Sequence, residues 1–126
     1  MKALDADTET RSYAKAAHYD RVSSRPNSYH PLPSTAVSKV LFKDKTAVGV
    51  EYRLVGINQV FSATACNEVI SAAGGVHLPQ ILQLSGVGPK ALLQSLGIPV
   101  VLDLPGVGTN FQDQLNMPVT YNCEPN

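Results

Sequence analysis

The sequence predicts an α/β fold, in which an antiparallel three-stranded β-meander is combined with one buried strand and several short helices. Three observations predict it. Apolar and polar residues alternate along consecutive segments joined by short turns, a glycine pair follows a short β-branched run, and two leucine-containing segments end at glycine. The length of 126 residues suits one domain with one core.

The balance of charges and the short apolar runs argue against two classes of partner, nucleic acids and membranes. The chain carries 10 basic and 10 acidic residues, which argues against a nucleic-acid binder driven by phosphate contacts. No apolar run approaches the ~20 residues that a membrane span needs. Residues 1–11 are charged and lack an apolar core, which does not fit a signal peptide. We expect no nucleic acid and no membrane among the partners, and we assign no compartment.

The N-terminal part of the chain predicts little regular structure. Residues 1–10 are polar and are expected to form a flexible tail. Alanines and tyrosines over residues 11–22 favour a short helix, which ends before the Arg-Pro-Asn turn at residues 25–27. A strand over Tyr29–Leu32 would follow, but two prolines demote it to an edge strand or an irregular segment.

The β-meander is the clearest pattern. Its predicted strands cover Ala36–Lys43, Thr46–Leu54 and Gln59–Ala65. The second strand alternates cleanly between apolar residues on one face and mostly small or charged residues on the other. Asp44 and Lys45 form the first turn, and a glycine and an asparagine mark the second, so the three strands are expected to pair in antiparallel order.

The stretch from Glu68 to Gly88 predicts a strand, a glycine turn and a helix. Val69–Ala73 is expected to be a buried strand, and the turn is assigned to Gly74 and Gly75. Pro79 suits the first position of the helix, which ends at Gly86 and Gly88. A strand end of small residues followed by glycine lets a flat or phosphate-bearing ligand lie against the backbone.

A second helix and a polar loop complete the pattern. Pro89 opens this helix, Gly97 ends it, and Ile98 supplies the apolar contact expected beyond a glycine cap. Its inner face is assigned to Ala91, Leu92, Leu93 and Leu96. A glycine–proline loop over residues 103–108 and a hydrogen-bonding stretch over residues 109–115 follow, and residues 116–126 look like the truncated start of a following region.

The stretch from Glu68 to Gly88 resembles the second signature of the glucose-methanol-choline (GMC) oxidoreductases, a family of FAD-dependent alcohol oxidases and dehydrogenases. The matching residues are Gly74, Pro79, Ile81, Leu82, Ser85, Gly86, Val87 and Gly88. Two positions depart, because Gly75 stands where Ala, Ser, Thr or Pro is usual and Leu78 where Ser or Thr is usual. A hydroxyl before Pro79 would cap the helix, and its loss costs about 1 kcal/mol, so the helix start is expected to be shifted or looser.

The resemblance covers residues 11–115 and is closest to the aryl-alcohol oxidase and versicolorin B synthase-like branches. Its strongest blocks are Lys45–Glu51, Glu68–Gly88 and Leu96–Asp113. It implies that residues 11–115 are the middle segment of an FAD/NAD(P)-binding domain. It further implies an enzyme that takes FAD and a small alcohol and transfers hydride from a CH–OH group to the flavin.

The resemblance also implies parts that this segment lacks. The sequence holds no Gly-x-Gly-x-x-Gly, and Gly86-Val87-Gly88 is a helix end and not that fingerprint. The catalytic histidine of the family lies beyond this region, so no catalytic residue and no metal ligand is assigned. We expect no turnover from the isolated segment. A non-catalytic, truncated α/β module that serves folding or interaction stays open as the alternative.

Five residues match positions near the cofactor in the family. Val37 matches a valine whose backbone contacts the adenine, Ala73 and Gly74 match small residues against the ADP part, and Asn110 and Asp113 match a loop near the flavin. Each has a structural alternative. Val37 can be an ordinary strand residue, Ala73 and Gly74 can serve close strand–helix packing, and the two loop residues can cap their own loop, which is the favoured alternative for them.

Other reactive side chains are interpreted as structural. His77 lies in the signature turn and not at the catalytic place of the family, and Ser85 lacks the Gly-x-Ser-x-Gly pattern of a nucleophile elbow. His18 and His30 have no partner at metal or triad spacing. Cys66 and Cys123 are interpreted as free buried thiols, with a disulfide as the alternative. An open sheet edge and an unfilled groove predict that the isolated chain is marginally stable or self-associates.

Overall fold

The computed structural model describes residues 10, 11, 13–20, 22 and 29–120, and it divides into two units, residues 1–34 and 35–126. The described residues of the first unit include a π-helix, η1 (Lys15–Tyr19), inside the predicted range 11–22. Lys15 Nζ lies 2.8 Å from Asp20 Oδ1, and the Tyr19 ring meets the Tyr29 ring edge-on, with 5.7 Å between centroids. Residues 29–32 form no strand, so the irregular alternative holds. The predicted tail over residues 1–9 lies outside the described residues.

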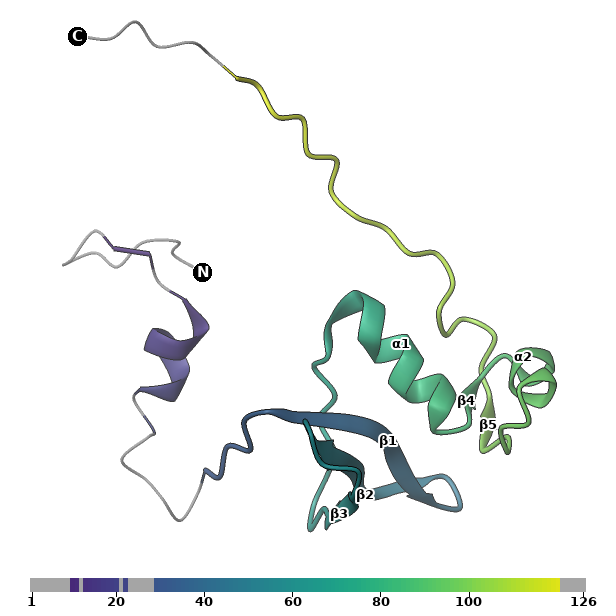
Figure 1. Cartoon of the computed structure of the whole chain (residues 1–126). Helices are drawn as coiled ribbons and strands as arrows, with labels where there is room; N and C mark the ends of the chain where they lie inside the picture. The colour runs from purple at the N-terminus through teal and green to yellow at the C-terminus, as the bar shows by residue number, and fades with distance from the viewer. Residues whose placement is uncertain (1–9, 12, 21, 23–28, 121–126) are drawn as a thin grey trace, which may run out of the picture. The chain divides into compact units, whose positions relative to one another are not determined.

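The predicted β-meander is confirmed in the second unit. Its strands are β1 (Thr35–Lys43), β2 (Thr46–Leu54) and β3 (Val60–Thr64). They pair in antiparallel fashion in the order β1-β2-β3 (Figure 1). The turn before β2 uses Asp44 with φ of 54°, and the turn before β3 uses Gly56 with φ of 84°.

A one-residue irregularity in β1 sets which side chains share a face. Val37 lies opposite Tyr52 and Lys39 lies opposite Glu51, so Ser38 is the extra residue of a β-bulge. After it, Val40 lies opposite Val50. Tyr52 and Val50 are two residues apart in β2 and so point to the same side. Val37 and Val40 therefore share that face, although they are three positions apart in the strand.

The predicted buried strand Val69–Ala73 is wrong. The segment has no strand pairing, and the Ile70 side chain is 79% exposed. The strands of the described residues form only the meander and the short pair β4–β5, so this segment has no neighbouring strand to supply its hydrogen bonds. A β-branched run predicts a strand only where a partner strand lies beside it.

The signature helix begins earlier than predicted. Helix α1 (Gly74–Leu84) starts five residues before Pro79, which lies inside it and cannot donate to the carbonyl of Gly75. Of the glycine pair, only Gly74 has positive φ, 81°, so one glycine makes the turn and Gly75 is part of the helix. No side chain caps the helix N-terminus, and Leu78 lies inside the helix, so the missing hydroxyl at position 78 does not decide where the helix starts.

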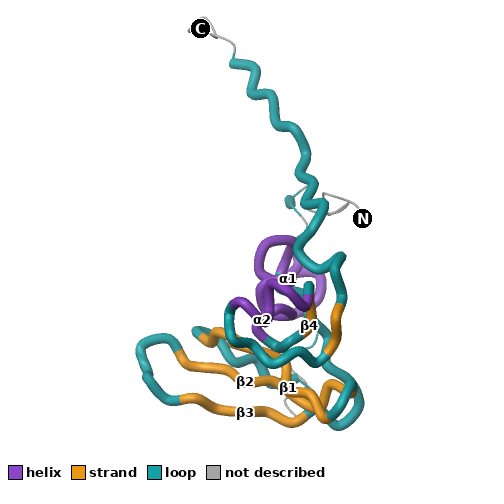
Figure 2. Tube along the Cα trace, turned by 90° about the vertical axis from the view of Figure 1, so that its right-hand side faces the viewer, coloured by secondary structure: helices purple, strands orange, loops and turns teal. Residues whose placement is uncertain are grey.

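The end of α1 connects the helix to the sheet. The helix stops at Gly86, with φ of 86°, as predicted. The Ser85 hydroxyl donates to the Ile81 carbonyl at 2.5 Å and accepts the Val40 N–H of β1 at 2.8 Å. Figures 1 and 2 both show α1 on one side of the three-stranded sheet. Ser85 and Val40 are both buried, so this connection lies in the core.

The rest of the second unit packs around this point. β4 (Val87–Gly88) pairs in parallel with β5 (Leu102–Asp103). Helix α2 (Lys90–Ser95) follows Pro89, and the Asp103 carboxylate accepts the Lys90 N–H at 3.0 Å. Among the described residues, no helix has the length and apolar character of a membrane span.

The end of α2 is as predicted, but its inner face is not. Ile98 N–H bonds to the Leu93 carbonyl at 2.9 Å and Gly97 N–H to the Gln94 carbonyl at 3.1 Å, which is a Schellman cap. Of the four predicted inner-face residues only Leu93 is buried, and the exposed ones are Ala91, Leu92 and Leu96. Six residues make fewer than two turns, so one leucine alone faces the β4 side.

Candidate functional site

Two of the predicted cofactor residues line one hollow, here called the valine groove. Its volume is about 250 Å³. Val37 contributes from β1 and Ala73 from the segment before α1. The other lining residues are Val40, Val50, Val69, Ile70, Ser71, Ala72 and Ile81. The structure therefore brings together two residues that lie 36 positions apart in the sequence, because the bulge at Ser38 turns Val37 to this face.

The backbone at the end of the groove is open. A Cβ atom built on Gly74 would meet no atom within 4 Å, and Val37 is 41% exposed. The first N–H groups of α1 have no partner inside the helix, and they favour an anion such as a phosphate. Close packing of Ala73 and Gly74 under another element would leave no such space. An apolar wall with bare backbone beside it fits the adenosine diphosphate part of a dinucleotide.

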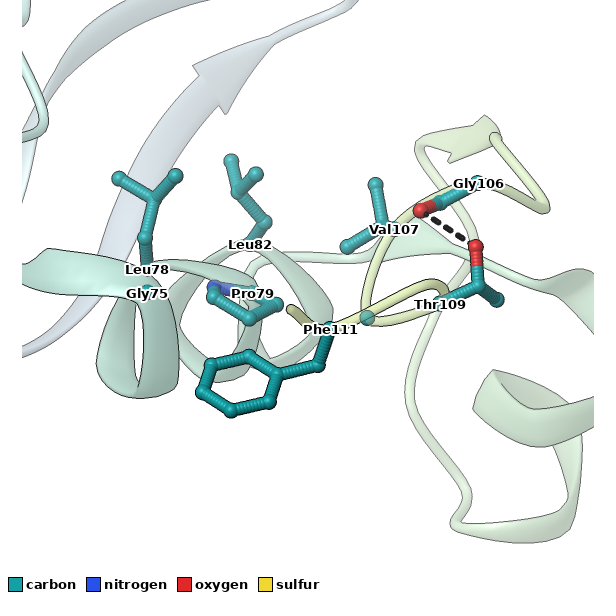
Figure 3. Close-up of a pocket in the computed structure, with 9 residues that line it drawn as sticks. Gly75, Leu78, Pro79, Leu82, Gly106, Val107, Thr109 and Phe111 are labelled. Atoms are coloured by element: carbon teal, nitrogen blue, oxygen red, sulfur yellow. Dashed lines mark hydrogen bonds between the residues drawn. The ribbon is translucent and has the colours of Figure 1, made fainter. Parts of the chain in front are cut away.

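A second hollow, here called the loop hollow, lies between α1 and the segment 106–111. Its volume is about 290 Å³. Figure 3 shows the Phe111 ring below the helix residues, with Val107 and Thr109 of the loop to the right. Gly75 faces the Phe111 ring, whose Cε2 would lie 3.4 Å from a Cβ at that position. A Cβ at position 75 would thus be in ordinary van der Waals contact with the ring, so the glycine that departs from the GMC signature is not required by this contact. The other lining residues are Leu78, Pro79, Leu82, Gly106, Val107, Gly108 and Thr109.

The structure does not bring Asn110 and Asp113 into either hollow. Asn110 has φ of 53°, and its Oδ1 accepts the Gln112 side-chain N–H at 3.3 Å. The Asp113 carboxylate accepts the Gln114 N–H at 2.8 Å. Both residues are exposed. These short-range bonds are those that loop capping predicts, and a contact with the flavin stays a prediction.

The remaining reactive side chains form no catalytic cluster among the described residues. His77 Nδ1 lies 3.0 Å from Gln80 Oε1 on the exposed side of α1, which fits a structural histidine. The described part of the chain contains no group of three or more potential metal ligands. Cys66 is free, as predicted, but it is exposed and not buried, because it follows the edge strand β3. Cys123 lies outside the described residues.

One carboxylate of the meander is held in its charged form. The Ser38 hydroxyl lies 2.9 Å from Glu51 Oε1, and Lys39 Nζ lies 3.3 Å from Glu51 Oε2. The Ser38 hydrogen bond, followed by Lys39, lowers the pKa of Glu51 below its ordinary value of 4.5. Because Lys39 and Glu51 lie on the sheet face opposite Val37, this carboxylate is a structural group and not part of the groove.

Sequence reasoning missed one residue beside the loop hollow. Gln83 Nε2 donates to the Val107 carbonyl at 3.2 Å and so connects α1 with the glycine loop. The sequence does contain a hint of this contact. Gln83 is a long polar residue between Leu82 and Leu84, and glycines that leave space for a side chain follow it in the chain. Its partner lies 24 residues away, which local patterns do not reveal.

Comparisons with known proteins identify one family of oxidoreductases. A family model described as GMC oxidoreductase matches residues 3–116. The chain is 53% identical over 122 residues to the dehydrogenase xptC of Emericella nidulans, a match that covers 97% of this chain and 20% of that protein. The chain thus spans about a fifth of the length of that curated relative.

Two solved structures resemble the chain in fold as well as in sequence. An FAD-dependent oxidoreductase from Chaetomium thermophilum matches with 58% identity and a TM-score of 0.82, over 87% of this chain and 19% of that one. A fungal aryl-alcohol oxidase matches with 44% identity and a TM-score of 0.72, over 78% of this chain and 16% of that one. FAD is thus the cofactor that the relatives indicate, and the α/β fragment of an FAD-binding domain is the fold.

Proposed function

The chain belongs to the GMC oxidoreductase family, and from that premise we propose that its parent protein is an FAD-dependent alcohol oxidase or dehydrogenase. In this proposal residues 11–115 form part of the FAD-binding domain and residues 116–126 begin the following region. The substrate is a small primary or aromatic alcohol. Bound FAD supplies the hydride acceptor for oxidation of the alcohol CH–OH group.

The observation that carries the proposal is the valine groove. Val37 and Ala73 line it together, and Gly74 leaves bare backbone beside it. We assign the Val37 backbone to the adenine edge, because an extended strand presents N–H and C=O groups in one plane. Ala73 and Gly74 lie against the ADP part, where a larger side chain would occupy the space of the ligand.

The loop residues Asn110 and Asp113 do not line the valine groove. Asn110 and Asp113 would reach the flavin end only if the loop turned their side chains away from their present local hydrogen bonds. The role of the chain's own residues is therefore to bind and orient FAD, and the proton of the alcohol is taken by a histidine of the parent outside this sequence. We expect the isolated chain to have no turnover and only weak affinity for FAD.

The test compares a groove variant with a matched surface variant in the full-length parent. Ala73→Phe fills the valine groove, whereas Ala91→Phe makes the same change on exposed α2. The parent and Ala91→Phe should copurify with flavin absorbance, and Ala73→Phe should lose most of it while staying folded. Equal flavin content in the two variants would remove the groove from the proposal.

Reading the transcript on both sides of this sequence provides a separate test. The proposal requires a Gly-x-Gly-x-x-Gly on a strand–helix turn before the segment and a catalytic histidine after it. Their absence would favour the alternative, a truncated α/β module that serves folding or interaction only. A flavin band that copurifies with the 126-residue chain alone would contradict the expected weak affinity.

We also propose that the isolated chain self-associates. β1 and β3 are edge strands, and the apolar side chains of Ile70 and Leu96 are 79% and 63% exposed. Edges and apolar patches of this kind pair with other chains unless something covers them. Sedimentation at increasing concentration should show growing species, and a single monomer throughout would contradict this.

A further inference from the structure

The side chain of Gln83 connects helix α1 with the glycine loop, a contact that the proposed function does not use. It starts on α1, one residue before the end of the helix, and its Nε2 donates to the Val107 carbonyl at 3.2 Å. Val107 belongs to the turn over residues 105–108, which leads into Phe111 and the loop hollow. One hydrogen bond thus spans from the signature helix to the loop.

Two glycines leave room for this side chain. A Cβ built on Gly88 would lie 3.0 Å from Gln83 Cγ, and one built on Gly108 would lie 2.8 Å from Gln83 Nε2. Real Cβ atoms rarely approach other atoms so closely, so a larger residue at either position would displace the glutamine or the loop. Gly88 belongs to the signature and Gly108 to the loop, so the glutamine lies between glycines from both segments.

The two glycines are not equivalent. Gly108 has φ of 82°, which favours glycine whatever lies nearby. The φ of Gly88 is not in the left-handed region, so its backbone would accept alanine, and the Gln83 side chain is the nearest obstacle. The absence of a side chain at Gly88 therefore follows from Gln83 and not from a turn.

We propose that Gln83 is a positioning residue that fixes the Gly106–Gly108 turn, and with it Phe111, against α1. The loop that follows carries Asn110 and Asp113, so the position of this turn sets how closely the loop approaches the flavin. The second step rests on the proposed function. The first step concerns only residues of this chain and stands without it.

A double-mutant cycle in the 126-residue chain tests the first step. Gly88→Ala should lower the melting temperature by roughly 4–8 °C, the shift expected for about 1 kcal/mol in a domain of this size. In the Gln83→Ala background, which removes Cγ, the same substitution should cost much less. Equal losses in both backgrounds would overturn the proposal, because they would show that Gly88 does not make room for Gln83.

If the Gly88→Ala chain does not fold, a milder pair of variants keeps the test open. Gln83→Met keeps the length of the side chain and removes the donor, and Gln80→Met makes the same change one turn earlier on the exposed side of α1. In ¹⁵N-labelled chain the Gly108 and Thr109 amide resonances should move in Gln83→Met and stay in place in Gln80→Met. Unchanged resonances in Gln83→Met would overturn the proposal.

The second step is tested in the full-length parent by the visible circular dichroism of its flavin. Gln83→Met should alter the flavin band and release FAD several-fold faster than Gln80→Met. Identical spectra and release rates in the two variants would overturn this step. If the double-mutant cycle shows coupling in the chain but the parent never carries flavin, the proposed function is overturned and the role of Gln83 in positioning the Gly106–Gly108 turn stands.

Discussion

The β-meander and the segment Val69–Ala73 both contain β-branched residues that favour strands, yet only the meander forms the strands that its sequence predicts. In the meander each strand has a partner a few residues away, across a turn at Asp44 or Gly56. Val69–Ala73 has no partner strand among the described residues and stays unpaired. A strand prediction is therefore reliable where the pairing partner is close in the sequence. It fails at Val69–Ala73, where no partner strand among the described residues lies beside the segment.

The end of α1 should be the most sensitive point of the second region. A Cβ on Gly86 would lie 2.4 Å from the Pro99 carbonyl and 2.9 Å from Val101 Cγ2, and φ is already 86°. Gly86→Ala should therefore cost on the order of 3 kcal/mol, from overpacking and backbone strain together. Urea unfolding of the chain measures this.

Gly97→Ala is the matched control for that substitution. Its φ of 68° brings a similar backbone strain, but an added Cβ would meet nothing within 4 Å. Its cost should stay near 1 kcal/mol. If the two variants lost the same stability, the packing of Gly86 against residues 99–101 would not be what holds this end of α1.

Loss of the hydrogen bond between Ser85 at the end of α1 and Val40 of β1 should have the second-largest effect on stability. Ser85→Ala removes the acceptor of the Val40 N–H and leaves that buried donor without its partner, which should cost about 1–3 kcal/mol. Ser95→Ala removes a comparable hydroxyl bond, to the Leu92 carbonyl, on an exposed surface and should change stability by less than about 0.5 kcal/mol. A loss no larger than that of the control would mean that Ser85 does not connect helix and sheet.

The smallest expected effect is confined to the meander. The pKa of Glu51 is lowered by Ser38 first and Lys39 second, so the folded state binds its proton less readily than the unfolded state does. Its contribution to stability is fully present above the ordinary pKa of 4.5 and is lost as the pH falls through the lower folded value. Ser38→Ala should raise the pKa of Glu51, which an NMR titration of its carboxyl carbon measures. A pKa unaffected by Ser38→Ala would contradict the assigned cause.

Local chemistry made most of this fold predictable. The three strands, the glycine ends of both helices and the loop over residues 103–108 follow from alternation and turn residues. Helix α1 starts five residues before the predicted start at Pro79, because one glycine, Gly74, is enough to make the turn. The sequence predicts more buried residues on α2 than the structure has. Leucine spacing indicates which side of a helix is apolar, but it does not indicate whether another element covers that side.

The candidate site was predictable in part. The resemblance selected Val37 and Ala73, and the structure places both at one groove. It could not reveal the bulge at Ser38 that turns Val37 to that face, nor the Ser85–Val40 bond across 45 residues, nor the Gln83 bond across 24. Such contacts depend on how distant segments pack, and no local pattern of residue types encodes them.

Amide hydrogen exchange at residues 69–73 tests the central claim most directly, namely that the valine groove, which these residues line, binds FAD in the full-length parent. In the 126-residue chain these amides should exchange at nearly unprotected rates, while those of β2 are slowed. In the FAD-bound parent the same five amides should be slowed at least a hundredfold. Equal exchange rates at these positions in the chain and in the parent would contradict the account.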